Sequence, residues 1–390
     1  MNRLTPQEVI QSLQSVLPRK DFIALHEPIF QGKETMYVTD CIHTGWVSSV
    51  GAYVDQFEQN LAEFTGVKKA VAVVNGTAAL HICLKLIGVK TNDEVLIPSL
   101  TFVATANAVT YTGAIPHFVD VSEKTLGMDP YKLEAYLAKH TFFKNNEIFS
   151  KKSGRRISAM VPMHTFGHPV EMDKLLDVAQ TFHLKVVEDA AESLGSYYQG
   201  KHTGNFGHIA ALSFNGNKII TTGGGGAILT NDEELAQRAK HITTTAKVSH
   251  PYEFVHDEIG YNYRMPNLNA ALGCAQLEQL PVFLKEKRKL ANRYERLFSS
   301  VSNIRFFKEP ENSCSNYWLN VLLLEQSDII MRDQWLDALN QNGIMSRPIW
   351  KPIHQLEMYR DCPAMPLDTT MKLAGQVINI PSSANLNEGL

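Results

Sequence analysis

The apolar residues in the first two thirds of the chain fall into short runs with helical patterns between them. Short apolar runs bounded by turn residues are typical of strands that are buried on both faces of a parallel sheet. Strand and helix alternate to about residue 250, which predicts an α/β fold with a largely parallel sheet covered by helices on both faces. Strands are expected near residues 70–75, 95–98, 115–121, 157–163, 185–189, 209–214 and 226–230.

The pattern changes after the sequence GYNYRMPNLN, where a long helical stretch begins. This helix is expected from about 267 to 299 with a break near Pro281, because proline lacks the N–H that a helix interior needs. A strand in NYWLNVLLL and a helix in DQWLDALNQNG follow, with Gly343 as the helix C-cap. These elements predict a smaller α+β domain at residues 266–390, after a large domain at residues 26–265.

Two segments lie outside this alternation. Residues 1–25 are expected to form a helical extension, in which Thr5 and Glu8 make a capping box with Pro6 at the first helical position. The apolar stripe of this helix consists of Val9, Ile10, Leu13, Val16 and Leu17. The segment 141–156, TFFKNNEIFSKKSGRR, is basic and polar and is expected to be a surface loop.

Composition narrows the function only by exclusion. With 44% hydrophobic and 20% charged residues, the 390-residue chain resembles ordinary globular proteins. A net charge of −3 gives no reason to expect nucleic acid, and no apolar run reaches the roughly 18 residues of a membrane span. The N-terminus does not resemble a signal peptide, and the five cysteines are scattered without a CxxC pair. These features predict a cytoplasmic enzyme with reduced thiols that binds neither nucleic acid nor membrane.

The sequence NGTAALH at residues 75–81 is the first motif that carries chemistry. It follows the apolar run AVAVV and opens a helical pattern. The first amides of a helix point outward with the positive end of the helix dipole behind them, so Gly76 and Thr77 can bind a phosphate group. The alternative is an ordinary N-cap, because threonine caps helices routinely.

Two further motifs place polar side chains where strands end. Asp189 ends the strand in VVEDAAES, where ligands of open α/β sheets bind. A carboxylate there can hold a pyridine nitrogen protonated, as a pyridoxal cofactor requires, and a helix-capping aspartate is the alternative. Ser213 ends the strand in IAALSF, and Lys218 follows it shortly before a run of glycines. Together these residues indicate a lysine held for covalent chemistry beside a bound phosphate.

Other interpretations of the motifs fit less well. GSYYQGKH matches GxxxxGK, but His202 stands where a P-loop needs Ser or Thr, so a hairpin is expected instead. The GGGG run at 223–226 does not extend to GxGxxG because Ile228 occupies the last glycine position. His164 and His168 flank TFG without a third ligand at metal-site spacing, so no metal site is predicted.

The motifs together resemble those of the sugar aminotransferases of the DegT/DnrJ/EryC1/StrS family, within the fold type I group of pyridoxal phosphate enzymes. The matching stretches cover most of residues 65–290 in the family's order. They are NGTAALH, PSLTFVATANAVTYTGAIPHFVDV, VVEDAAESLGSYYQGKHTGNFGHIAALSFNGNKIITTGGGGAILTND and IGYNYRMPNLNAALGCAQLEQL. Residues 25–58 are similar to the subgroup acting on UDP-4-keto-6-deoxy-N-acetylhexosamines. The resemblance therefore implies a fold type I enzyme of bacterial surface polysaccharide biosynthesis.

The resemblance implies a role for each motif residue. Lys218 would form a Schiff base with pyridoxal 5′-phosphate and then act as general acid and base. Asp189 would pair with the pyridine nitrogen, Phe102 would stack on the ring, and Glu192 would reach the phenolic oxygen. The family usually has glutamine at the last of these positions, so Glu192 is a departure from its pattern. The phosphate would be bound by Gly76, Thr77 and Ser213.

The resemblance also implies an assembly and two substrates. Asn262 would contact the phosphate bound by a neighbouring subunit, which implies a homodimer with shared active sites. Glutamate is the expected amino donor, and a nucleotide-linked 4-keto-6-deoxy sugar, UDP-linked in the subgroup, is the expected acceptor. The residues expected to line the acceptor site are Trp46, Ser48, Ser49 and His354. The family's dehydratases carry histidine where this chain has Lys218, so the match favours transamination. A ketosugar dehydratase and a non-catalytic regulatory protein that binds pyridoxal phosphate are the alternatives.

Overall fold

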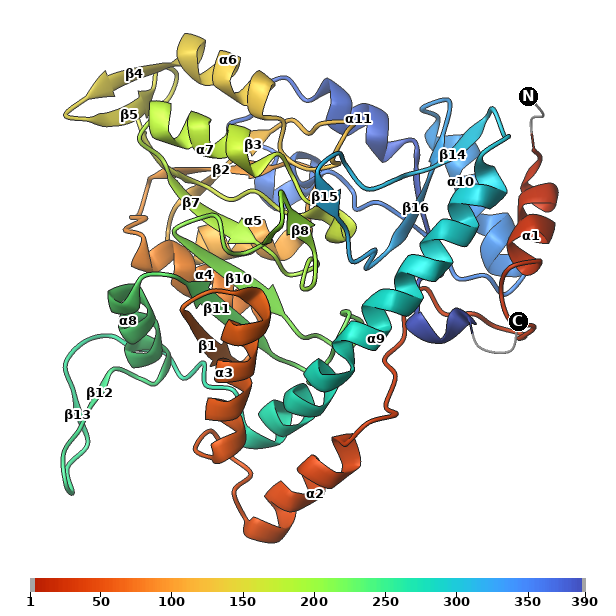
Figure 1. Ribbon diagram of the computed structural model, residues 1–390. Helices are drawn as coiled ribbons and strands as arrows, with labels where there is room; N and C mark the ends of the chain where they lie inside the picture. The colour runs from red at the N-terminus through yellow and green to blue at the C-terminus, as the bar shows by residue number, and fades with distance from the viewer. Residues whose placement is uncertain (1–3, 388–390) are drawn as a thin grey trace.

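A central sheet forms the middle layer of the molecule in the computed structural model, which describes residues 4–387 (Figure 1). Its main strands are β1 (Lys69–Val73), β2 (Glu94–Pro98), β3 (Ile115–Val119), β6 (Arg156–Met160), β7 (Lys185–Asp189), β10 (Ile209–Ser213) and β11 (Gly226–Thr230). Their order is β1-β11-β10-β7-β6-β2-β3. β11 is antiparallel to both of its neighbours, and the other pairs on this path are parallel. The expected strands and the mainly parallel sheet are thus confirmed.

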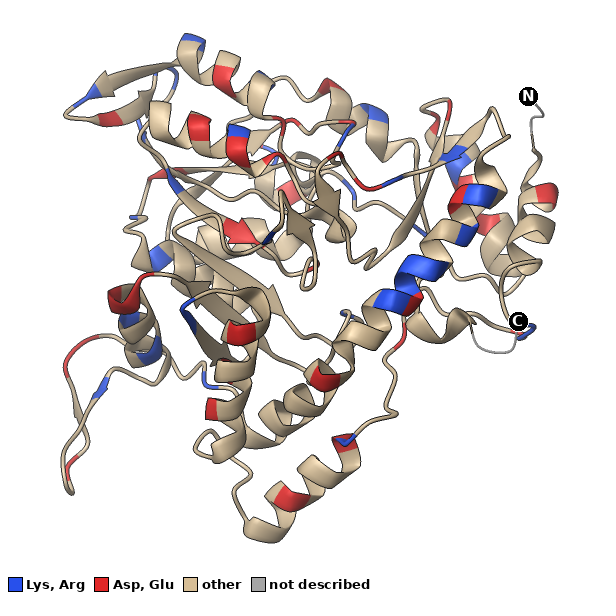
Figure 2. Cartoon of the chain, viewed as in Figure 1, with Lys and Arg blue, Asp and Glu red and all other residues tan. Residues whose placement is uncertain are grey.

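Helices cover both faces of this sheet, because alternate residues of each strand point to opposite faces. One face packs against α4 (Gly76–Leu86), α5 (Val103–Tyr111) and α8 (Glu233–Thr243). The other face packs against α3 (Ala52–Thr65), α6 (Pro130–His140), α7 (Met172–Thr181) and α9 (Asn267–Phe298). In β1, Val71 and Val73 belong to the first layer, and Ala70 and Ala72 belong to the second. Charged residues lie mainly on helices and loops and are few on the strands (Figure 2).

The C-terminal part of the chain is built around α9, which runs diagonally across the view in Figure 1. This helix is continuous through Pro281, so the expected break is wrong. Leu280 and Phe283 beside the proline are buried in the core, and such packing offsets the cost of an interior proline, about 3 kcal/mol. After α9 come β14 (Ile304–Phe306), β16 (Asn320–Leu324), α10 (Ile329–Gln341), β17 (Arg347–Pro348), α11 (Asp368–Ala374) and β18 (Val377–Ile380). The four strands form an antiparallel sheet.

The N-terminal helix α1 (Pro6–Gln14) packs against this C-terminal unit and not against the central sheet. Thr5 caps the helix through the Glu8 N–H, and Glu8 accepts from the Thr5 N–H, which confirms the capping box. Its buried residues, with Leu17 beyond the helix end, share one cluster with side chains of α9, α10 and β16. Residues 21–23 then meet the end of α10 at Gly343, which has a φ of 73°. The next helix, α2 (Glu34–Thr44), lies beside α9.

Several short hairpins lie around the central sheet. The segment expected to be a loop at 141–156 contains β4 (Thr141–Lys144) and β5 (Glu147–Ser150), which pair with each other and extend the sheet at β6. Phe142 and Phe149 stack across this hairpin with ring centroids 5.8 Å apart, so cross-strand packing outweighs the polar composition.

Two further hairpins lie outside the central sheet. GSYYQGKH forms the expected hairpin, β8 (Tyr197–Tyr198) and β9 (Lys201–His202), which β15 (Ser313–Cys314) joins. Another hairpin, β12 (Lys247–Val248) with β13 (Val255–His256), projects from the body of the molecule (Figure 1). Within residues 4–387, no helix is long and apolar enough to span a membrane.

The topology brings the ends of three strands to one edge of the sheet. β7 and β10 are parallel, and β1 has the same direction because β1 and β10 both run antiparallel to β11. Asp189 and Ser213 are the last residues of β7 and β10, and Gly76 follows β1. The carboxyl edge of a parallel sheet is where ligands of this fold class bind.

Candidate active site

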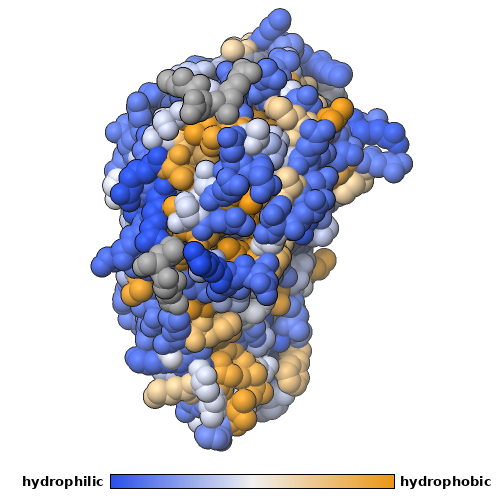
Figure 3. Space-filling model, turned by 90° about the vertical axis from the view of Figure 1, so that its right-hand side faces the viewer, coloured by the Kyte–Doolittle hydropathy of each residue, from blue (hydrophilic) through white to orange (hydrophobic). Residues whose placement is uncertain are grey.

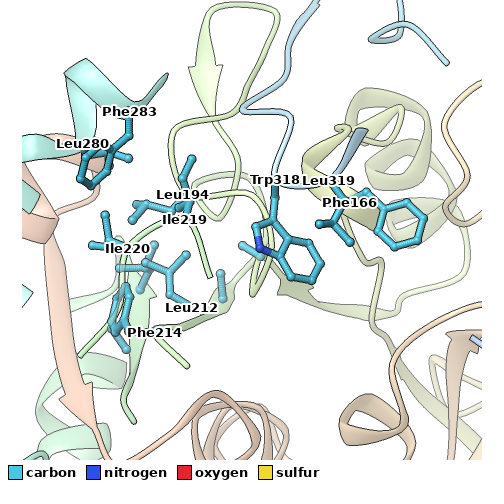
Figure 4. Close-up of a cluster of buried hydrophobic side chains, with 14 of the residues drawn as sticks. Phe166, Leu194, Leu212, Phe214, Ile219, Ile220, Leu280, Phe283, Trp318 and Leu319 are labelled. Atoms are coloured by element: carbon cyan, nitrogen blue, oxygen red, sulfur yellow. The ribbon is translucent and has the colours of Figure 1, made fainter. Parts of the chain in front are cut away.

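Lys218 lies after the end of β10 and faces one carboxylate and one indole ring. Its Nζ is 3.1 Å from Glu192 Oε1 and 3.8 Å from the centroid of the Trp318 ring. Trp318 also fixes the backbone beside the lysine, because its indole N–H donates to the Asn217 carbonyl at 2.8 Å. Figure 4 shows Trp318 beside Phe166 in the cluster of buried apolar side chains. The lysine amine is therefore held by residues from two distant parts of the sequence.

Glu192 is buried between this amine and a backbone amide. Its Oε2 accepts from the Phe166 N–H at 2.9 Å. Phe166 has a φ of 57°, a left-handed conformation that costs on the order of 1–3 kcal/mol for a residue with a bulky side chain. Burial raises the pKa of Glu192 to about 7, and the charge of Lys218 opposes this shift. The carboxyl group therefore changes its charge near neutral pH.

Asp189 is buried at the end of β7 with neutral donors. Its Oδ2 accepts from Thr105 Oγ1 at 2.7 Å, and its Oδ1 accepts from the Ala191 N–H at 3.2 Å. Within residues 4–387 it forms no ion pair, and burial raises its pKa although these hydrogen bonds oppose the shift. A cationic N–H group placed against this carboxylate would stabilise its charge.

Helix α4 begins where β1 ends, and its N-cap is Asn75. The Asn75 side chain accepts from the Ala78 N–H at 2.8 Å, so the alternative of Thr77 as N-cap is wrong. The N–H groups of Gly76 and Thr77 belong to the first turn, where a helix offers no intrahelical acceptor. Ser213 lies against this turn, since a Cβ added to Gly76 would be 2.8 Å from the Ser213 Cβ. The three expected phosphate-binding residues therefore lie together at the positive end of α4.

Phe102 belongs to a row of aromatic rings that leads to Lys218. It is half exposed at the start of α5, and its ring centroid is 6.4 Å from that of Trp350. Trp350 is 5.0 Å from Phe166, and Phe166 is 6.4 Å from Trp318, measured between centroids. The row connects an exposed ring with the buried ring that faces the lysine amine.

The expected acceptor residues are not gathered at one place in the chain. Trp46 and Ser48 are exposed in the loop after α2, and their carbonyls each accept from Asn267 at 2.7 Å, at the start of α9. Ser49 follows in the same loop. Within residues 4–387, none of the three bonds to Lys218 or to either carboxylate beside it.

Asn262 and His354 have different surroundings. Asn262 is exposed after β13, where its backbone forms a bridge with Thr244. His354 Nδ1 is 2.7 Å from Ser99 Oγ, just after the end of β2, and burial lowers the pKa of the imidazole. His354 is therefore next to the segment that carries Phe102, whereas the Asn262 side chain accepts from Arg264 Nε at 3.1 Å and has no hydrogen bond to Lys218 within residues 4–387.

Three contributors to the site were not expected from the sequence. Thr105 holds Asp189, and nothing in the helical pattern around it distinguishes this threonine from others. Phe166 lies between two histidines that attract attention as metal ligands. Trp318 falls in a segment expected to be strand, but β16 begins only at Asn320. The reason is Asn316, whose side-chain amide donates to the carbonyls of Glu192 and Leu194 at 2.9 Å each and draws the segment to the site.

The two histidines around Phe166 have separate surroundings. His164 Nε2 is 3.1 Å from Glu188 Oε2, and both side chains are fully buried. His168 is also fully buried, and neither of its ring nitrogens has a hydrogen-bond partner within residues 4–387. Burial, assisted by Arg288, lowers the pKa of His168 to about 3.

Comparison with known proteins agrees with this geometry. The DegT/DnrJ/EryC1/StrS aminotransferase family matches residues 28–389. The GDP-perosamine synthase of Escherichia coli O157:H7 is 36% identical over 367 residues, which make up 94% of each chain. The spore coat polysaccharide biosynthesis protein SpsC of Bacillus subtilis is 36% identical over 352 residues, 87% of this chain and 86% of SpsC.

Solved structures show the same fold. The aminotransferase PseC of Helicobacter pylori, involved in the biosynthesis of pseudoaminic acid, matches with a TM-score of 0.85 and 26% identity over 94% of this chain and 95% of PseC. This chain therefore belongs to the DegT/DnrJ/EryC1/StrS aminotransferase family of pyridoxal phosphate-dependent, fold type I sugar aminotransferases.

Proposed function

We propose that this protein transfers an amino group from glutamate to the ketone of a nucleotide-linked 4-keto-6-deoxy sugar. The observation that carries the proposal is the Lys218 amine 3.1 Å from Glu192, near the sheet edge that bears buried Asp189. A primary amine, a carboxyl group of adjustable charge and a buried anion are what pyridoxal chemistry needs. The relative that makes GDP-perosamine supports a nucleotide sugar as the acceptor.

The residues at this edge fit pyridoxal phosphate. Asp189 is buried with only neutral donors, and a protonated ring nitrogen would supply its missing cation. The N–H groups of Gly76 and Thr77, with the Ser213 hydroxyl, would bind the phosphate. Phe102 would cover one face of the ring. When bound, the cofactor supplies an aldehyde for amino groups and a ring that withdraws electrons from the substrate carbon.

The side chains around Lys218 would then divide the work of proton transfer. The Lys218 Nζ would take the proton from the amine-bearing carbon of the donor and return one to the acceptor. Glu192 would hold the Lys218 amine in place through Oε1, while the Phe166 N–H fixes the carboxyl group through Oε2. The buried rings of Phe166 and Trp318 would exclude water from this side of the lysine.

A homodimer with shared sites is part of the proposal. Exposed apolar side chains occur on α2 and its following loop and on the β12–β13 hairpin and its following segment; they are Met36, Ile42, Trp46, Val50, Tyr252, Phe254 and Ile259. Apolar side chains also gather toward the lower end of the face in Figure 3, where α2 lies in Figure 1. Exposed apolar surface of this kind marks interaction sites. A second copy packed there would bring Asn262 and the Trp46–Ser49 loop to the partner's site.

The division into domains and the cellular location complete the proposal. A large domain at 26–265 and a small domain at 266–390 would enclose the ligands between them, with residues 1–25 attached to the small domain through α1. Residues 1–3 and 388–390 of these ranges lie outside the described residues. A cytoplasmic enzyme would meet nucleotide sugars where they are made.

The first test is the absorbance spectrum of the purified protein with pyridoxal phosphate, before and after glutamate. Glutamate should convert the cofactor to its pyridoxamine form, and one member of a panel of GDP-, UDP- and dTDP-linked 4-ketosugars should reverse the change. The UDP-linked N-acetylhexosamine is the acceptor that residues 25–58 favour. Mass spectrometry of the product separates amination from dehydration. A spectrum that glutamate leaves unchanged would contradict glutamate as the donor.

Two sets of variants test the residue assignments. Lys218→Ala should abolish turnover, whereas Lys285→Ala, on the exposed side of α9, should not. Mixing the inactive Lys218→Ala and Asn262→Ala proteins should restore part of the activity, because a mixed dimer would contain one intact site. Absence of recovery after proven subunit exchange would argue against Asn262 acting in the partner's site.

A further inference from the structure

We propose that Trp318 is a positioning residue for Lys218, which holds the free amine over its indole face. The inference rests on the proposed function of Lys218. The Nζ lies 3.8 Å from the ring centroid, well within the range of a cation–π contact. Trp318 is buried, so water competes little for the amine at this face.

The indole reaches the lysine in two ways. Its face meets the side-chain amine, and its N–H donates at 2.8 Å to the carbonyl of Asn217, the residue before Lys218. One rigid ring thus contacts the amine of Lys218 and the backbone just before it. The opposite side of the amine faces Glu192 Oε1 at 3.1 Å. The amine therefore lies between a π face and a carboxyl group, and both contacts hold it in one place.

The same short segment fixes both partners of the amine. The backbone N–H of Trp318 donates to Asn316 Oδ1 at 2.7 Å, and the side-chain amide of Asn316 donates to the backbone carbonyl of Glu192. The Trp318 carbonyl in turn accepts from Lys287 of α9 at 3.2 Å. Asn316 therefore joins the backbone of Trp318 to the backbone of Glu192 and positions the two residues relative to each other. The C-terminal unit of the chain thereby positions the Lys218 amine through Trp318.

This arrangement has a chemical consequence. When Lys218 is free, the indole and Glu192 hold its amine between them. Removing the indole face should leave the amine less well held and easier for an aldehyde to reach. Trp318→Phe keeps an aromatic face of smaller area, whereas Trp318→Met has a somewhat smaller and more flexible side chain than phenylalanine and no ring. The two variants therefore separate the effect of the ring from that of filling space.

The test is reductive methylation of the full-length, cofactor-free protein with formaldehyde and a borane, with Lys218 followed by mass spectrometry. The rate should rise in the order wild type, Trp318→Phe, Trp318→Met, with the last roughly threefold to thirtyfold above wild type, the range expected for loss of a cation–π contact. Exposed Lys285 in the same samples reports the intrinsic reagent rate. Trp335→Met, in the buried core of α10, is the matched control and should leave Lys218 labelling unchanged.

Equal rates in Trp318→Phe and Trp318→Met, or a Trp318→Met rate equal to wild type, would overturn the proposal, because the ring face would then contribute nothing. Circular dichroism of each variant shows whether the fold is retained, and Trp318→Phe serves where Trp318→Met does not fold, since it should still exceed wild type. Because the labelling requires neither cofactor nor sugar, its outcome is independent of the acceptor panel that tests the proposed function.

Discussion

The backbone of Phe166 joins the carboxyl group of Glu192 to the segment that leads into β16. Its N–H donates to Glu192 Oε2 at 2.9 Å, and its carbonyl accepts from the Leu319 N–H at 3.3 Å. It does so with a φ of 57°, which persists only where surrounding contacts outweigh its cost. Here the ring is buried against Trp350 and Trp318. The strained residue is thus bonded to Glu192, and its N–H fixes the carboxyl group that faces Lys218 in one orientation.

Glu192→Gln should flatten the pH dependence of the cofactor spectrum near neutrality. In the wild type the carboxyl group gains its charge as the pH rises through about 7, since burial raises the pKa of Glu192 to that value. Glutamine does not ionise in this range, so the titration step should disappear. Because glutamine is the usual residue at this position in the family, activity at pH 8 should stay within about tenfold of wild type. Spectra recorded from pH 6 to 9 check this. An unchanged titration step in the variant would show that another group is responsible.

The sheet was predictable from the sequence because its buried strands are continuous apolar runs, and the polar residues that end them stand at a known edge. The sequence alone therefore assigns Asp189, Ser213 and Gly76 to that edge. The partners of Lys218 could not, because they depend on packing between distant segments. Trp318 and Asn217, for example, are 101 positions apart and meet through one hydrogen bond.

The errors have local physical causes. Pro281 predicts a break, yet the buried residues around it keep α9 straight enough to continue. The polar residues at 141–156 predict a loop, yet two phenylalanines stack across a hairpin there. In both cases tertiary contacts outweigh a local preference, which is the usual limit of reasoning from propensity.

Gly226→Ala should damage the phosphate-binding turn, although Gly226 itself lies on β11. A Cβ at this position would be 2.5 Å from the Asn75 carbonyl carbon and 2.7 Å from the Gly76 nitrogen, both of them backbone atoms. Relief of this clash requires α4 or β11 to shift, at a cost of about 1–3 kcal/mol in the free energy of unfolding. Pyridoxal phosphate affinity should fall with it. Urea unfolding and a cofactor titration measure the two effects.

Gly224→Ala is the matched control, because it lies in the same glycine run and a Cβ there would meet nothing within 4 Å. Its stability should change little. If Gly224→Ala and Gly226→Ala weaken the cofactor equally, the close approach of β11 to Asn75 is not the reason for the glycine.

Asp189→Asn should release the cofactor without unfolding the protein. The amide can still accept from Thr105, but it cannot balance a protonated ring nitrogen. Loss of one partner from a buried ion pair corresponds to about a hundredfold or more in affinity. Cofactor retained after gel filtration, read by absorbance, measures this. Asp173→Asn, which alters a carboxylate bonded to Tyr198 in the first turn of α7, should retain the cofactor as wild type does.

His168 should make the protein less stable in mild acid. Burial, with a smaller effect of Arg288, lowers the pKa of His168 from 6.5 to about 3, so the folded state resists protonation that the unfolded chain accepts. The stability associated with the neutral ring is therefore complete above about pH 6.5 and is lost as the pH falls toward about 3. At pH 5 the loss from this residue amounts to about 2 kcal/mol.

His168→Met removes this ionisation while keeping an apolar side chain between the rings of Phe307 and Tyr317, where sulfur packs well. Urea unfolding at pH 7, 6 and 5 should show that the variant loses less stability with acid than the wild type, by about 2 kcal/mol at pH 5. Buried His202, with a pKa lowered to about 4, is present in both proteins, so its contribution cancels in the comparison. Parallel curves for the two proteins would mean that His168 gains a proton, and a partner for it, within the folded state.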